Sequence, residues 1–163
     1  MRLPAGDAGL VVHDRKEDPR PMSTSLDPST ETAVTTYADF ARLWRARADL
    51  RGDPSFAVRV LRESVLQAQR MPPGPELDRF HAEPPTVGST GWDALVAGAA
   101  VFTGAGRVSR GVLDWTRSPD RWSRELFDPL GVPAKYLLLE SLRTPAALRE
   151  RNVILSIGNL QGV

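Results

Sequence analysis

Residues that commonly carry catalysis are scarce in this sequence. It holds no cysteine, which excludes a thiolate nucleophile, a Cys-ligated zinc site and a disulfide framework. Its two histidines, His13 and His81, do not have the spacing of metal ligands. The sequence also lacks the Gly-x-Ser-x-Gly motif of a serine hydrolase in which a histidine could act as the base. Gly104-Ala105-Gly106 could open a dinucleotide-binding fingerprint, but it follows a predicted helix rather than a strand, and Ser109 occupies the third glycine position. We therefore expect a protein that is not an enzyme, with no catalytic residue, metal or cofactor.

Tryptophan and arginine offer a different chemistry, that of binding. Residues 107–124 hold two of the four tryptophans together with five arginines, and their charges sum to +3. Aromatic and guanidinium groups in one segment are typical of protein interfaces, although a small domain must also bury its largest side chains. The predicted interface residues are Trp115, Arg117, Arg121, Trp122 and Arg124.

A second basic stretch, residues 36–71, also sums to +3. The preferred interpretation of its arginines is a solvated helix face, on which Asp39, Asp49 and Glu63 balance the positive charge. The alternative is a nucleic-acid surface, although these helices are too long for a helix-turn-helix motif. That alternative rests on Arg42, Arg45, Arg59 and Arg62.

Composition limits the class of protein. The chain has 163 residues, 21 Lys plus Arg and 20 Asp plus Glu, so no overall charge draws it toward nucleic acid. The longest apolar stretch, from Ala94 to Phe102, is interrupted by Gly98 and is too short to span a membrane. The N-terminus shows no secretory signal. We expect a cytoplasmic protein without a membrane partner.

The N-terminal residues 1–35 form the first predicted region. Four prolines, mixed charges and the absence of an apolar period predict a disordered tail. Met22 precedes Ser-Thr-Ser and is a plausible true start. Residues 36–163 form the second region, a single helical domain.

Three helices should form the main body of that domain. Apolar periodicity predicts a first helix from Thr36 to Gly52 and a second from Asp53-Pro54 to Met71, joined as an antiparallel hairpin. A proline-rich linker follows, attached to the core by Leu77 and Phe80. Thr90 then begins a central helix that ends at Gly104 and whose small residues let neighbours approach closely.

The C-terminal part contains shorter predicted elements. Pro119, Pro133 and Pro145 each open a short helix. The β-branched run Val153–Ile157 is the single strand candidate. The expected fold is therefore mainly α, with a disordered N-terminal tail and one short C-terminal strand.

Four stretches, in this order, resemble a group of small uncharacterised actinobacterial helical proteins over roughly residues 36–160. They are Asp53-Pro54-x-Phe56-Ala57-x-Arg59; Trp92-Asp93-Ala94-Leu95-x-Ala97-Gly98; Asp114-Trp115-Thr116 with Pro119 and Arg121; and Thr144-Pro145-Ala146-x-Leu148-Arg149-x-Arg151-Asn152-Val153. Some members are similar to antitoxins or to the C-terminal region of helix-turn-helix regulators, and some are encoded beside a nucleotidyltransferase-type toxin. This sequence departs from the group where Gly104-Ala105-Gly106 shortens the segment after the central helix, and residues 1–71 contain no recognisable repressor domain.

The resemblance implies no catalytic residue, and it directs the functional prediction toward binding. We expect a non-enzymatic, antitoxin-like protein that binds and neutralises a protein partner, for which a nucleotidyltransferase-type toxin is the candidate. The alternative is a transcriptional regulator that binds nucleic acid through the basic hairpin of residues 36–71.

Overall fold

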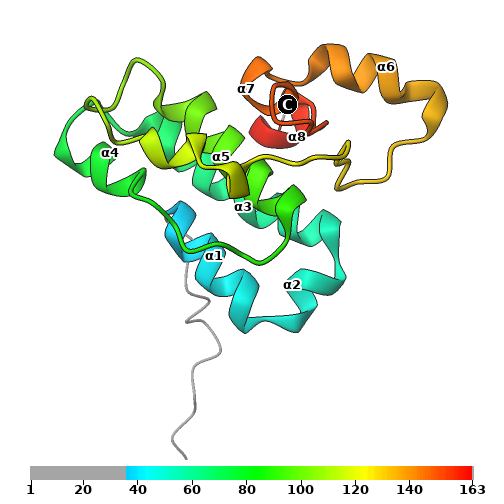
Figure 1. The fold of residues 1–163 in the computed structure, drawn as a ribbon, viewed down its shortest axis with the longest axis horizontal. Helices are drawn as coiled ribbons and strands as arrows, with labels where there is room; N and C mark the ends of the chain where they lie inside the picture. Colours follow the sequence, from blue (N-terminus) through cyan, green and yellow to red (C-terminus); the bar gives the residue numbers. More distant parts are fainter. Residues whose placement is uncertain (1–35, 163) are drawn as a thin grey trace, which may run out of the picture. The chain divides into compact units, whose positions relative to one another are not determined.

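The computed structural model describes residues 36–162; the disordered tail and the start at Met22 were predicted for residues outside this range. The described part is mainly helical, as predicted, with eight α-helices and two short 3-10 helices (Figure 1). Helices α1 to α5 form the body of this part, and the C-terminal elements pack on α3 and α5.

The predicted helical hairpin is present, but its first helix is divided in two. The three helices are α1 (Tyr37–Ala46), α2 (Ala48–Gly52) and α3 (Pro54–Arg70). Arg47 has an extended backbone between α1 and α2. Thr36 and Asp39 form a capping box at the start of α1, and the Asp53 carboxylate accepts a hydrogen bond from Phe56 N at 2.9 Å to cap α3. Side-chain caps thus set where both helices begin.

The predicted central helix is confirmed as α5 (Thr90–Gly104). Every residue from 91 to 100 is buried, and α5 contacts α3, α7 and both 3-10 helices. The linker before it forms α4 (Pro75–Phe80), where Leu77 and Phe80 are buried as expected. The N-cap of α5 is Ser89, and the Asp93 carboxylate accepts a hydrogen bond from Val87 N and pairs with Arg121.

Two features hold the core around α5 together. Aromatic rings gather at its start, where the ring centroids of Trp92 and Trp44 are 4.5 Å apart. Further along, a Cβ on Gly98 would lie 3.1 Å from the carbonyl oxygen of Ala147 and from the Leu148 side chain of α7 (Ala146–Arg149). Glycine at this position therefore lets α7 pack directly on α5.

The C-terminal half departs further from the predicted pattern. The helix expected from Pro119 is reduced to the 3-10 helix η2 (Pro119–Arg121), and another 3-10 helix, η1 (Asp114–Arg117), precedes it. The helix expected from Pro133 forms as α6 (Ala134–Arg143), and the one from Pro145 forms as α7. A last helix, α8 (Ile157–Gln161), was not predicted and packs on α3.

The predicted C-terminal strand is wrong. Val153 forms one isolated parallel bridge with Phe127, and no strand occurs in residues 36–162. Ile154 N donates to Phe127 O at 2.9 Å, but the ladder goes no further. Val153, Ile154 and Leu155 are buried because they pack as an extended core segment, and α8 follows immediately. The β-branched side chains of Val153 and Ile154 indicated burial rather than sheet pairing.

Candidate functional site

Two of the predicted interface residues lie in the protein interior. Arg121 is 1% exposed, and its guanidinium carbon lies 4.9 Å from the ring centroid of Trp115. Trp115 is also buried, and its Nε1 donates to His81 O at 3.0 Å. Trp115 lies in η1 and Arg121 in η2, and both 3-10 helices contact α5. Their placement corrects the expectation of an interface role for Trp115 and Arg121.

Arg121 holds three segments together. Its guanidinium donates to the Asp93 carboxylate at 3.3 Å and to Pro84 O at 2.6 Å, and it lies 3.6 Å from Glu83. Burial raises the pKa of Asp93, while the Val87 amide and the Arg121 charge act in the opposite direction. This buried ion pair joins η2, α5 and the linker before α5, which is a structural task.

Trp122 is partly accessible, with 36% of the residue exposed. The guanidinium carbon of Arg151 lies 4.6 Å from its ring centroid. Arg151 itself is buried; it donates to Ala147 O at 2.9 Å and to Thr116 O at 3.1 Å, and burial lowers its pKa. Trp122 therefore rests on a fixed cation and keeps one part of its ring toward solvent.

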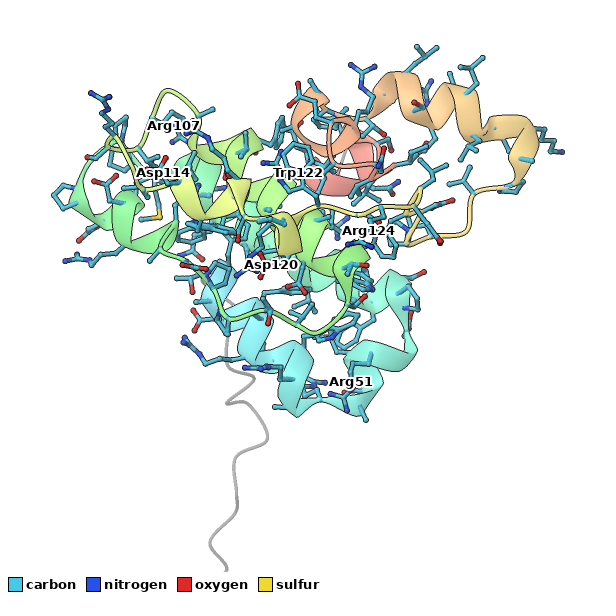
Figure 2. All side chains as sticks on the ribbon, viewed as in Figure 1. Arg51, Arg107, Asp114, Asp120, Trp122 and Arg124 are labelled. Atoms are coloured by element: carbon cyan, nitrogen blue, oxygen red, sulfur yellow. The ribbon has the colours of Figure 1, made fainter. Side chains whose placement is uncertain are left out.

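The other two predicted interface residues are exposed but do not lie together. Arg117 is 3.4 Å from the carboxylate of Asp114. Figure 2 shows Asp114 and Arg124 well apart. Arg117, Trp122 and Arg124 thus do not form one continuous surface.

A buried polar network surrounds His81. Its Nδ1 lies 2.9 Å from Leu77 O and its Nε2 lies 2.9 Å from the Thr103 hydroxyl, which is 2.7 Å from the Tyr37 hydroxyl. His81 and Tyr37 have no exposed surface, and Thr103 is 2% exposed. These hydroxyl and imidazole groups satisfy one another's hydrogen-bonding capacity in the core. Since they are buried, a substrate cannot reach them in the folded protein.

The arginines of the alternative nucleic-acid surface have different neighbours. Arg42 pairs with Asp39, Arg59 lies 5.7 Å from the Phe56 ring centroid, and Arg62 lies beside Gly162. Arg45 is exposed at the end of α1. No ion pair, hydrogen bond or ring contact described for residues 36–162 gathers these four side chains on one surface.

Four of the seven large apolar side chains that are exposed in residues 36–162 lie on α6. Tyr136 is 50% exposed, Leu138 74%, Leu139 47% and Leu142 67%, and we call this set the α6 apolar face. No residue of α6 is buried, and the helix lies at the edge of the described part, joined by a loop at each end (Figure 1). Large exposed apolar patches mark interaction sites on soluble proteins.

The inner side of α6 is held by polar contacts rather than by a core. Glu140 is partly buried, and its Oε1 accepts hydrogen bonds from Ser156 N at 3.0 Å and from Asn159 Nδ2 at 3.1 Å. Thr144 follows the helix; its hydroxyl donates to Glu140 O at 2.8 Å and accepts from Leu155 N at 3.1 Å. The helix is therefore fixed in an orientation that turns Glu140 inward and leaves Leu138, Leu139 and Leu142 outward.

The α6 helix was predicted from the sequence, but the α6 apolar face was not. The available signal was the run Leu137–Leu139, because three consecutive residues spread over 200° of a helix and cannot all face one core. Tyr136 widens the apolar arc further, and Leu142 falls within it. An apolar arc this wide on a short helix indicates a second surface to bury.

Residues 36–162 contain no group of three or more His, Cys, Asp or Glu side chains that could hold a metal ion. None of the helices described is long and apolar enough to cross a membrane. Comparison of the chain with protein-family models, with curated proteins and with solved structures finds no match.

Proposed function

We propose that this protein acts by binding another protein through the α6 apolar face. The observation that supports the proposal is the reversed polarity of α6, with four large apolar side chains outward and Glu140 inward. A helix that served only the fold would turn its apolar side to the core.

The free energy available at this face is large enough for a specific contact. Complete burial of an exposed leucine or similar side chain contributes about 1.5–3 kcal/mol. Because between one quarter and one half of each of the four side chains is already covered, the remaining gain is about 4–7 kcal/mol before the entropic cost of association. This face could therefore provide the apolar centre of an interface whose rim supplies further contacts.

The resemblance to antitoxin-like proteins suggests the specific form of this function. In that form the protein neutralises a nucleotidyltransferase-type toxin by covering part of its surface. Trp122, Arg117 and Arg124 remain accessible for contacts outside α6. Catalysis by this chain plays no part in the proposal.

Photocrosslinking tests the proposal in cells that produce the protein. A benzophenone amino acid at position 138 should give a covalent adduct with another protein, whereas the same group at the exposed Glu63 of α3 should not. The double variant Leu138→Ser/Leu142→Ser should lose at least tenfold in affinity for the crosslinked protein and keep its helical circular dichroism. Leu126→Ser, which removes another exposed leucine, is the matched control.

The absence of any adduct at position 138 would contradict protein binding through α6. Mass spectrometry of the adduct tests the antitoxin form of the proposal. An antitoxin-like protein should crosslink to a toxin whose activity it suppresses. An adduct with a protein that has no toxic activity would refute the antitoxin form alone.

A further inference from the structure

We infer that the partner segment is an amphipathic helix that lies along α6 and carries two carboxylates about two turns apart. The inference rests on the proposed function and names the chemistry of the partner at the same surface. It follows from where α6 places its charges.

The two ends of the α6 apolar face carry cations. Lys135 lies at the first turn and Arg143 at the last residue of the helix, and both are exposed. Eight residues of helix separate them by about 12 Å along the axis. Lys135 Nζ lies 4.8 Å from the ring centroid of Tyr136, so its charge is held at the edge of the apolar face.

Neither cation forms an ion pair with a carboxylate of residues 36–162. The nearby carboxylates have other tasks. Glu140 binds Ser156 and Asn159, and Asp128 accepts hydrogen bonds from the amides of Leu130 at 3.0 Å and Gly131 at 3.1 Å. The outer surface of α6 is therefore apolar in the middle and positive at both ends.

A hollow next to α6 gives a partner side chain room beside one of the cations. It is lined by Arg143 and by residues 156–159 at the start of α8, among them Ile157, which is 40% exposed. A carboxylate that enters this hollow can meet the Arg143 guanidinium while its helix covers Leu139 and Leu142. Arginine favours such carboxylate contacts.

A second copy of the chain does not fit this charge pattern. Antiparallel pairing of two α6 helices would set Lys135 against Arg143, and parallel pairing would set each cation against itself. A partner helix with acidic residues at i and i+7 and leucines at i+3 and i+4 places opposite charges at both ends and apolar groups between them.

Two helix-stabilised peptides test this inference against the full chain. Both carry leucines at i+3 and i+4; one has Glu at i and i+7, and the other has Lys at these positions. Fluorescence anisotropy at low salt should show about tenfold tighter binding of the Glu peptide, because two favourable exposed ion pairs replace two like-charge contacts. Lys135→Glu/Arg143→Glu should reverse the preference.

The control variant Arg45→Glu/Arg59→Glu changes net charge equally but lies away from α6, and it should retain the preference for the Glu peptide. Equal affinity for both peptides, lost in Leu138→Ser/Leu142→Ser, would overturn the charge inference and leave the proposed function standing. Dimerisation that this double variant abolishes would identify a second copy as the occupant and also overturn it. If neither peptide binds, the inference fails, and crosslinking at position 138 decides the proposed function separately.

Discussion

At the scale of single residues, His81 ties the stability of the protein to pH. Leu77 O faces Nδ1, so in the neutral ring Nδ1 carries the proton and Nε2 accepts from the Thr103 hydroxyl. Burial lowers the pKa of His81, and the nearby Arg107 charge acts in the same direction, whereas the Leu77 carbonyl and Asp78 oppose it. The folded protein therefore favours the neutral imidazole.

We predict that the free energy of unfolding falls between pH 7.5 and pH 5.5. The unfolded chain takes up a proton at the histidine below its ordinary pKa of about 6.5, and the folded chain does so only at lower pH. The contribution of His81 to stability is thus fully present well above pH 6.5 and declines as the pH falls through this range, with a loss on the order of 1 kcal/mol at most by pH 5.5. Urea titrations of the wild type, His81→Gln and His13→Gln would measure it.

His81→Gln should remove this pH difference, and His13→Gln should keep it, since these are the two histidines of the chain. An unchanged pH difference in His81→Gln would show that another group is responsible.

The burial of Arg121 is a feature that could not be predicted from the sequence. Tryptophan and arginine in residues 107–124 indicated a contact surface, yet Arg121 is among the most buried side chains because Asp93, Pro84 O and the Trp115 ring all reach it. Asp93 lies 28 residues and Pro84 lies 37 residues away from Arg121 in the chain. The composition indicated that arginine and aromatic side chains would contact one another. Whether those contacts lie in the core or on the surface depends on the fold.

At the scale of elements, α5 shows why helices were predicted more reliably than their contacts. Its small residues indicated close packing, and Gly98 indeed lies against the α7 backbone. The strand prediction failed because an extended buried segment and a strand share the same β-branched sequence. The α6 helix was predicted, whereas its outward apolar face depends on the long-range contact between Glu140 and Ser156.

We predict that Gly98→Val lowers the free energy of unfolding by about 1–3 kcal/mol, because the added carbons meet the fixed carbonyl oxygen of Ala147. Gly52→Ala is the control. It lies at the end of α2 with nothing within 4 Å of an added Cβ, so helix propensity should leave stability unchanged or raise it by up to about 1 kcal/mol. Urea denaturation of both variants measures the contrast, and equal effects would refute close packing at Gly98.

At the scale of the whole molecule, the described helices differ widely in how they are supported. All residues from 91 to 100 in α5 are buried, and α3 contacts four other helices. By contrast, α6 buries no residue. Local stability follows buried contacts, so opening should begin at α6 and reach α5 last.

Hydrogen exchange followed by mass spectrometry should show this order. The sharpest comparison is between α1 and α6, which are both ten residues long but bury four residues and none, respectively. We predict that α6 amides exchange at least tenfold faster than α1 amides and that α5 amides exchange most slowly. Equal protection of α1 and α6 would mean that α6 is supported by contacts other than those described.

The single bridge between Phe127 and Val153 has an evolutionary consequence. It brings together the points where the chain leaves the body and where it returns, since Phe127 N donates to Asn152 O at 2.8 Å and Asn152 Nδ2 donates to Ser123 O at 2.8 Å. Phe127 therefore fixes one end of residues 128–143, and Thr144, whose hydroxyl accepts a hydrogen bond from Leu155 N at 3.1 Å, fixes the other. Such an excursion can gain, lose or exchange residues without displacing the core, so descendants of one scaffold can diverge in what they recognise while retaining the same fold.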